Sequence, residues 1–412
     1  MKQNERSLFG PGFLVTAAFV GPGTIATASK AGSSFEFALL WAVGFAVVAT
    51  ILLQEMTARL GVVTGQGLGE SLRATFPSAF PRFLVFTLVI VAILIGNSAF
   101  QAGNITGASS GIAGLVGIPF RWIAVPIAIV AWLLLMSGKF KLIQNVLVFF
   151  VVLMSILFII SAIIAKPDWG LVLQGLVVPN LPAESIGIAI ALIGTTVVPY
   201  NLFLHSSSAA NTWGNSPDPR LALSRSRLDL IISILIGGLI TASIVITAAV
   251  TFADKESSGN LQEIAKQLEP SLGFASHWLL GIGLFSAGLT SAITAPLAAA
   301  YAISGCLGWS SNLADRKFKI VFSAVILFGL IGCLVFADGR SPAQLIVVAQ
   351  IANGMLLPIV AIILLIVMNN QKLLGDKING LVGNVLGVVI VLLTSVWGLQ
   401  KIAAELIKIV SK

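Results

Sequence analysis

Residues 20–24 read Val-Gly-Pro-Gly-Thr and lie within the apolar run FGPGFLVTAAFVGPGTIATASKAG, residues 9–32. In a helix interior, glycine costs about 1 kcal/mol and proline about 3 kcal/mol relative to alanine. The run therefore predicts a helix that is interrupted near its middle, at Gly21, Pro22 and Gly23. What such an interruption can do depends on whether the helix lies in water or in a membrane.

The composition excludes a water-soluble protein. Of the 412 residues, 57% are hydrophobic and only 10% are charged. A soluble domain carries about 25% charged residues, so this chain cannot cover a water-facing surface. The two cysteines, Cys306 and Cys333, lie in or near apolar runs, where we expect buried free thiols rather than a disulfide. We therefore expect one all-α integral membrane domain over residues 1–412.

Eleven apolar segments are long enough to cross a membrane as helices. With a cytoplasmic N-terminus, 15 of the 24 Lys and Arg residues fall on the cytoplasmic side, in agreement with the positive-inside rule. We therefore expect a multi-pass protein of the inner (plasma) membrane with an extracytoplasmic C-terminus. The segments lie near residues 8–31, 36–60, 82–112, 120–138, 141–165, 184–211, 228–253, 275–304, 318–337, 342–368 and 380–408.

The sixth segment contains a second interruption, because "GTTVVPYNLFLHSS" (194–207) places Pro199 near its middle. Non-helical backbone at membrane depth is tolerated only where it is buried in protein or lines a cavity. Paired interruptions in corresponding positions of two halves indicate the substrate site of a transporter. We therefore expect two inverted five-helix repeats, 8–165 and 184–368, and an additional helix at 380–408. The alternative at each segment is a simple kink, since Gly and Pro are frequent in membrane helices.

Several stretches are similar to the Nramp family of divalent metal transporters. Residues 9–32 with "LLQEMTARLGVVTGQGLGESLR" (52–73) resemble the opening of that family, and "VVPYNLFLHS" (197–206) resembles its sixth helix. "SAGLTSAITAPLAAAYAISG" (286–305) and "QLIVVAQIANGMLLPIVAIILL" (344–365) resemble its eighth and tenth helices. The resemblance implies the LeuT-like fold, with about 11 transmembrane helices, helices 1 and 6 broken, and secondary active transport by alternating access.

The positions that hold the metal in that family carry other residues here. Residues 21–24 read Gly-Pro-Gly-Thr where the family reads Asp-Pro-Gly-Asn, and residues 198–200 read Val-Pro-Tyr where it reads Met-Pro-His. Alignment of the third helix back from "GIP" (117–119) puts Gln101 and Asn104 at the family's two acids connected with proton transfer. By this comparison, none of the family's divalent-metal ligands is retained.

The loss of negative charge favours an anionic substrate. At an effective dielectric constant of about 20, a unit charge 4 Å away is worth roughly 4 kcal/mol, and helix N-termini freed at the breaks attract anions. We therefore predict transport of a small inorganic anion such as bicarbonate. One alternative is a divalent metal ion (Mn, Fe or Mg) in a rebuilt site of carbonyls, Thr24 and Asn201, and another is a small amino acid symporter. The expected substrate-binding residues are Gly21, Pro22, Gly23, Thr24, Thr195, Thr196, Val198, Tyr200 and Asn201.

Sodium is the candidate coupling ion for symport of an anion. In LeuT-like sodium symporters, hydroxyls of helix 8 and carbonyls of helix 1 bind Na⁺, and the resemblance transfers this role to Val20, Gly23, Thr290 and Ser291. The alternative is that these hydroxyls pack helices, as Ser and Thr do in membranes. No other cofactor is expected.

Seven further polar residues on apolar segments are candidates to line the pathway. Each has a structural alternative: a lysine can snorkel to water, amides can bridge helices, and a single histidine can serve as a hydrogen-bonding residue despite its suitable pKa. The seven residues are Lys30, Gln54, Gln101, Asn104, His205, Gln350 and Asn353.

Catalytic functions receive no support from the sequence. The chain has two histidines, no cluster of metal ligands and no phosphate-binding loop of the Walker type. The net charge of +8 is spread over short loops rather than gathered in a nucleic-acid-binding stripe. We therefore expect a transporter, not an enzyme, whose partners are a small ion and the lipid bilayer.

Overall fold

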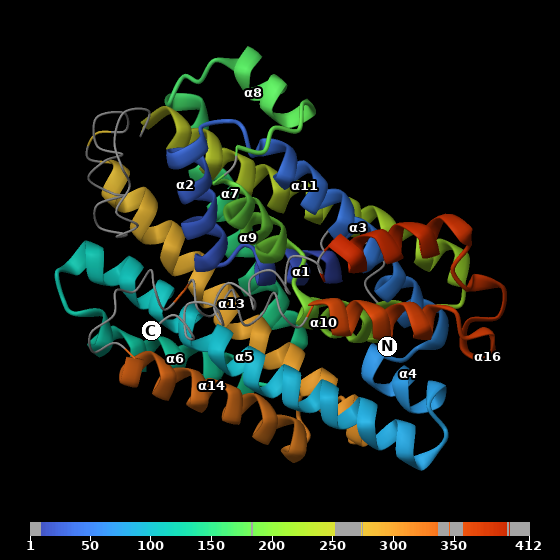
Figure 1. Cartoon of the computed structure of the whole chain (residues 1–412). Coiled ribbons are helices and arrows are strands. Elements are labelled where there is room, and N and C mark those ends of the chain that lie inside the picture. The colour runs from blue at the N-terminus through green and yellow to red at the C-terminus, as the bar shows by residue number, and fades with distance from the viewer. Residues whose placement is uncertain are drawn as a thin grey trace, which may run out of the picture.

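The computed structural model describes residues 10–182, 184–251, 275–336 and 357–393, together with residues 273, 346 and 395. Within these residues the regular structure is entirely helical (Figure 1). The first half contains α1 (Pro11–Phe19), α2 (Pro22–Phe35), α3 (Leu40–Thr64), α4 (Leu68–Thr75), α5 (Ala79–Val116), α6 (Phe120–Met136), α7 (Phe140–Ile164) and α8 (Trp169–Val177).

The second half contains α9 (Ile186–Thr196), α10 (Pro199–Trp213), α11 (Pro219–Thr251), α13 (Ala275–Leu307) and α14 (Arg316–Phe336). It continues with helices at Leu357–Met368 and Leu381–Leu393, separated by α16 (Gln371–Leu374) and a 3₁₀ turn at Gly375–Lys377. The proposed division into repeats 8–165 and 184–368 stays a prediction.

Among the described residues, seven helices are long and apolar enough to cross a membrane, or nine if each of two bent helix pairs counts as one span. The bent pairs are α1 with α2 and Leu357–Met368 with Gln371–Lys377. α6 and Leu381–Leu393 are apolar but shorter than 18 residues. The predicted all-α membrane fold is confirmed, whereas the predicted number of eleven spans is not.

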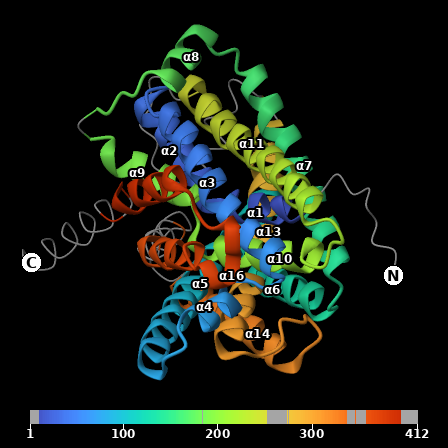
Figure 2. The ribbon, with the colours of Figure 1, turned by 90° about the vertical axis from the view of Figure 1, so that its right-hand side faces the viewer.

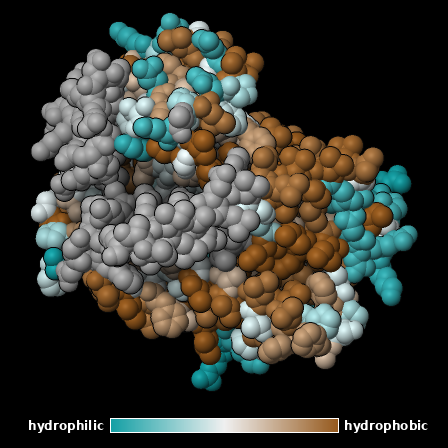
Figure 3. Space-filling model, viewed as in Figure 1, coloured by the Kyte–Doolittle hydropathy of each residue, from teal (hydrophilic) through white to brown (hydrophobic). Residues whose placement is uncertain are grey.

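The outer surface of the bundle is apolar, as a lipid-facing surface must be. Large hydrophobic side chains are exposed along α5, α7 and α14, for example Leu84, Phe149 and Phe328. Figure 3 shows hydrophobic side chains over much of the visible side, with hydrophilic residues gathered at its right-hand end and upper tip. Cys306 and Cys333 are free and buried, as predicted.

The helices of the interior approach one another at glycines. A Cβ at Gly288 of α13 would lie 2.4 Å from the backbone nitrogen of Ala108, and one at Gly111 of α5 would lie 2.5 Å from the carbonyl oxygen of Gly281. α5 and α13 therefore pack backbone against backbone. α1 lies near the centre of both views, and it contacts α7, α10, α11 and α13 (Figures 1 and 2). This buried position surrounds the first break with protein.

Candidate functional site

The first break lies between α1 and α2. α1 ends at Phe19, α2 begins at Pro22, and the two helices are bent by 57° relative to each other. Gly21 is extended, with φ −103° and ψ 179°, and its N–H donates to the carbonyl of Phe19 over 2.8 Å. The N–H of Val20 donates to the carbonyl of Thr16 over 3.0 Å. The interruption predicted from Gly-Pro-Gly is therefore confirmed.

Gly21 is required because two other helices approach its backbone. A Cβ at this position would lie 2.7 Å from Oγ of Ser291 on α13 and 3.9 Å from Oδ1 of Asn104 on α5. Cβ atoms essentially never approach another heavy atom within 3.0 Å, so a side chain here would displace the Ser291 hydroxyl and its hydrogen bond to the carbonyl of Ala18. The first break thus lies where α2, α5 and α13 meet.

The second break separates α9 from α10 at Val197 and Val198. Their ψ angles of 84° and 123° are not helical, and both residues are buried. Pro199 follows at the first position of α10, where its missing N–H removes no helical hydrogen bond. Residues Ile186–Trp213 nevertheless form one span of 28 residues, so this break lacks the sharp bend of the first.

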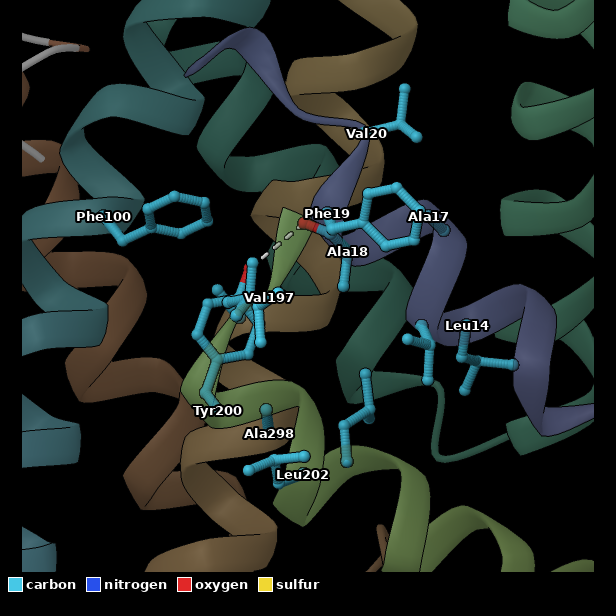
Figure 4. Packing of buried hydrophobic residues seen from close by; sticks show 14 of the residues in the cluster. Leu14, Ala17, Ala18, Phe19, Val20, Phe100, Val197, Tyr200, Leu202 and Ala298 are labelled. Atoms are coloured by element: carbon cyan, nitrogen blue, oxygen red, sulfur yellow. Dashed lines mark hydrogen bonds between the residues drawn. The ribbon is translucent and has the colours of Figure 1, made fainter. Parts of the chain in front are cut away.

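Side chains from α10 and α13 donate hydrogen bonds to backbone carbonyls near the C-terminal end of α1. The hydroxyls of Tyr200 and Ser291 each donate to the carbonyl of Ala18 over 3.2 Å, and Figure 4 shows Tyr200 reaching up to α1. Asn201 Nδ2 donates to the carbonyl of Val15 over 3.5 Å. Three side chains from two other helices therefore fix the end of α1 that leads into the break.

The hydroxyl protons around the breaks are already donated to carbonyls. Thr24 Oγ1 donates across the first break to Phe19, and Thr195 and Thr196 donate to the carbonyl of Leu192 within α9. A hydroxyl has one proton and two lone pairs, so these groups still offer a ligand oxygen lone pairs. The breaks are therefore better suited to a cation than to an anion.

Unpaired oxygens lie at both breaks. Asn201 is fully buried, and its Oδ1 makes no hydrogen bond within the described part of the chain. None of the described hydrogen bonds ends on the carbonyl of Val20 or of Val197. Amide and carbonyl oxygens are common ligands of hard cations, so these three oxygens are the strongest candidate ligands of the site.

Aromatic and apolar groups form the wall beside the breaks. The rings of Phe100 on α5 and Tyr200 lie 5.4 Å apart at 56° (Figure 4). Pro22 packs against Gly107, where a Cβ would lie 2.2 Å from the proline ring. The sequence analysis did not identify Phe100, because nothing in the apolar pattern of its segment distinguishes it.

Gln101 compensates for a proline in the neighbouring helix. Pro296 lies inside α13 and has no N–H, so the carbonyl of Ala292 loses its helical partner. Gln101 Nε2 donates to that carbonyl over 3.0 Å. In this structure Gln101 therefore bridges α5 and α13.

Two further amides of α5 flank Gln101. Asn97 Nδ2 donates to the carbonyl of Ala295 over 2.8 Å, while Asn104 Nδ2 lies 3.4 Å from Gln101 Oε1. The oxygen of Asn104 is the one that lies beside Gly21. Of the three amides, Asn104 is thus the one that reaches the first break.

His205 joins α10 to α3 away from the breaks. Its Nδ1 lies 3.1 Å from Gln54 Oε1 and 3.3 Å from Thr57 Oγ1, and all three side chains are buried. Gln54 and His205, both predicted to line the pathway, are therefore brought together as a bridge between two helices.

The predicted sodium ligands are only partly assembled. Ser291 reaches the carbonyls at the end of α1, whereas Thr290 Oγ1 donates back to Ala287 of its own helix over 3.0 Å. The role of Val20, Gly23, Thr290 and Ser291 in holding sodium stays a prediction.

The remaining predicted residues divide by position. Pro22, Gly23 and Val198 are buried at the breaks. Lys30 is exposed on α2, eight residues beyond Pro22 and so about 12 Å along the helix from the break. Gln350 and Asn353 lie outside the described residues.

One buried acid was missed by the sequence analysis. The backbone N–H groups of Gly10 and Gly12 donate to the two carboxylate oxygens of Asp229 on α11, each over 2.7 Å. Asp229 is the second residue of the predicted apolar segment 228–253, and the sequence analysis assigned it no role. The available signal was the Gly-Pro-Gly at residues 10–12, which permits a close approach to the start of α1.

Comparison with known proteins identifies the family. Residues 12–404 match the family model described as "Natural resistance-associated macrophage protein-like", Nramp. The chain belongs to the Nramp family. The match covers nearly the whole chain, so the resemblance of its separate motifs is confirmed, and with it the identification as a multi-pass membrane transporter.

The Nramp relatives include proteins named for metal transport. The chain is 27% identical over 387 residues to the divalent metal cation transporter MntH of Caldanaerobacter subterraneus subsp. tengcongensis, covering 92% of this chain and 89% of that protein. It is 28% identical over 378 residues to MntH of Klebsiella pneumoniae, with 90% and 88% covered.

Solved structures support the LeuT-like Nramp fold. The manganese transporter of Eremococcus coleocola superposes with a TM-score of 0.79 at 21% identity, covering 96% of this chain and 86% of that one. A nucleobase-cation-symport-1 family transporter superposes with a TM-score of 0.55 at 15% identity, covering 97% and 94%. At these identities the likeness concerns the fold alone.

The predicted anionic substrate is wrong. The relatives are named divalent metal cation transporters, and none of these comparisons points to bicarbonate or an amino acid. The physical reason lies at the helix starts, where the prediction expected free N–H groups. At each start, two of the first three residues offer an anion no free N–H: Pro22 and Pro199 have none, and the N–H groups of Thr24 and Asn201 donate to the carbonyls of Gly21 and Val198.

Proposed function

We propose that this Nramp protein transports a hard divalent metal ion through the two breaks. Its relatives carry divalent metals by name, and Mg²⁺, Mn²⁺ and Fe²⁺ are the ions that a rebuilt oxygen site could accept. In the proposed orientation the N-terminus is cytoplasmic and the C-terminus extracytoplasmic in the plasma membrane, because this places 15 of the 24 Lys and Arg residues inside.

The ligand chemistry favours Mg²⁺ and Mn²⁺ within this group. The candidate ligands are Asn201 Oδ1, the carbonyls of Val20 and Val197, and the lone pairs of Thr24 Oγ1. All four are neutral oxygens. Carbonyl and water ligands suit Mg²⁺ and Mn²⁺, whereas softer ions gain from sulfur and imidazole.

A site of neutral oxygens binds weakly and leaves water on the ion. Loss of one carboxylate at about 4 Å removes roughly 4 kcal/mol, which lowers affinity on the order of a thousandfold. Mg²⁺ dehydrates reluctantly and usually keeps several waters in protein sites. We therefore expect a partly hydrated ion and an affinity that suits an abundant cation.

The membrane potential can drive uptake of a dication. Two charges gain about 4.6 kcal/mol per 100 mV of inside-negative potential, equivalent to accumulation on the order of a thousandfold. A coupled ion is therefore not required energetically. The predicted sodium site at Thr290 and Ser291 is tested by comparing uptake with and without a sodium gradient.

The observation that carries this proposal is the buried oxygen of Asn201, which accepts no hydrogen bond from any described residue. Titration calorimetry of the purified protein with Mn²⁺ and Mg²⁺ tests it. Asn201→Asp should lower the Kd for Mn²⁺ at least tenfold, because it restores a charge at the breaks, and Asn201→Ala should raise the Kd at least tenfold.

Asn211→Asp is the matched control. It lies on the same helix about 15 Å further along and is exposed, so the same charge there should change the Kd less than twofold. Equal effects of Asn201→Asp and Asn211→Asp, or no dication binding by any variant, would contradict the proposal.

A further inference from the structure

The start of α1 depends on a cap from another helix. α1 has nine residues, and its N-cap residue, Gly10, provides no side-chain cap. The first N–H groups of a helix have no partner within it and need one elsewhere. Here the two oxygens of Asp229 on α11 accept from Gly10 and Gly12, each over 2.7 Å.

This arrangement differs from the other aspartate caps of the described chain. Asp168 accepts from Gly170 at the start of its own helix α8, Asp218 accepts from Arg220 and Leu221 just inside α11, and Asp315 accepts from Lys317 just inside α14. These three caps are local and exposed. Asp229 instead joins residues 217 positions apart in the sequence, inside the bundle.

The contact continues along α11 in steps of four residues. Thr16 Oγ1 donates to the carbonyl of Ser233 over 2.6 Å, and Ser233 Oγ donates to the carbonyl of Asp229 over 2.6 Å. A Cβ at Gly237 would lie 2.2 Å from the ring of Phe19. Positions 229, 233 and 237 share one helical face, so α1 lies on α11 from its first residue to its last.

The two glycines at the start of α1 allow this close approach. A Cβ at Gly10 would lie 2.6 Å from the Asp229 carboxylate, and one at Gly12 would lie 2.9 Å from both the Asp229 carbonyl and Ser233 Oγ. Substitution at either position would lift α1 from α11 without altering the acid.

The use of a charged cap needs a reason, because a buried carboxylate is expensive to desolvate. Asp229 is the only charged residue that is buried within the described part of the chain. Its two oxygens accept N–H groups at the positive end of a helix dipole, and these contacts offset part of that cost. An amide could accept only one of these bonds and would turn its NH₂ group toward the other N–H.

We infer that Asp229 is the positioning residue of the ion site. This inference rests on the proposed function, because the C-terminal end of α1 leads to the carbonyl of Val20, a candidate ligand of the ion. Tyr200, Asn201 and Ser291 hold the carbonyls of Val15 and Ala18 near that end. About 12 Å of helix separates the cap from the break. Rotation of α1 about a loosened start therefore displaces the carbonyls that face the ion.

The first test measures the concentration dependence of initial Mn²⁺ uptake in proteoliposomes. Asp229→Asn should raise KM about tenfold with less than a threefold change in maximal rate. Gly12→Ala should do the same while leaving the carboxylate in place. Asp218→Asn, which makes the same change at a local cap that does not touch α1, should leave KM unchanged.

The second test does not depend on the transported ion. Leu14→Cys, in a chain with Cys306 and Cys333 replaced by alanine, places a thiol on the buried face of α1. A water-soluble maleimide should label it slowly, and Asp229→Asn or Gly12→Ala should speed labelling at least fivefold. Both variants should elute as monodisperse protein in gel filtration.

These two tests separate the inference from the proposed function. If no dication is transported but labelling accelerates, the proposed function fails and the role of Asp229 in holding α1 stands. If Asp229→Asn and Gly12→Ala keep both the original KM and the slow labelling, the inference is overturned. A variant of Asp229 that cannot be purified leaves the decision to Gly12→Ala.

Discussion

The first break bends the chain by 57° between α1 and α2, whereas the second leaves Ile186–Trp213 as a single span. At the first break, Tyr200, Ser291 and Asn201 from other helices hold the carbonyls of α1. At the second, Thr195 and Thr196 bond within their own helix. The first break is thus supported from outside and the second from within, so distant substitutions should affect them unequally.

The largest expected difference between the breaks concerns their glycines. Gly21→Ala should reduce dication uptake more than a hundredfold, because its Cβ would lie 2.7 Å from Ser291 Oγ. Gly194→Ala, two residues before the end of α9, meets no described residue within 4 Å. It should leave uptake unchanged and favour the helix by up to about 1 kcal/mol. Uptake assays of both variants in proteoliposomes check this, and equal losses would remove the distinction.

A smaller effect is expected from loss of the hydrogen bond by which Gln101 of α5 binds α13 beside the first break. Gln101→Ala leaves the carbonyl of Ala292 unpaired and should destabilise the protein by about 1–3 kcal/mol. Pro296→Ala supplies an N–H to the same carbonyl, so the double variant should recover most of that loss. Thermal unfolding in detergent of the two single variants and the double variant measures this double-mutant cycle. Additive losses of stability would show that Gln101 does not act by satisfying the carbonyl of Ala292.

The smallest effect compares single hydroxyls at the two breaks. Tyr200→Phe removes a bond between helices and should raise the KM for Mn²⁺ by about fivefold, in line with roughly 1 kcal/mol for one hydrogen bond. Thr195→Val removes a bond within α9 and should change KM less than twofold. A larger effect of Thr195→Val would reverse the comparison.

The sequence predicted both breaks and the all-α membrane fold because these follow from local chemistry. Glycine and proline in apolar runs interrupt helices wherever the runs pack. The substrate was mispredicted because charges were counted without knowing which protons were already donated. That information depends on contacts such as Thr24 with Phe19 and Tyr200 with Ala18, which no local pattern reveals.

The roles of Gln101 and Asp229 could not be predicted for the same physical reason. Gln101 bonds to Ala292 only because α5 and α13 pack in one particular register. Asp229 meets residues 217 and 219 positions away. A single sequence contains no measure of such pairings, whereas the close-approach glycines at residues 10, 12 and 21 are visible in it.

The central claim is that the breaks pass a divalent cation through a site of neutral oxygens. Uptake of Mn²⁺ and Mg²⁺ into proteoliposomes under an imposed inside-negative potential tests it most directly. Uptake should increase with the potential, proceed without a sodium gradient, and fall at least tenfold in Asn201→Ala. No dication uptake at any potential, with protein that is folded and correctly inserted, would contradict the account.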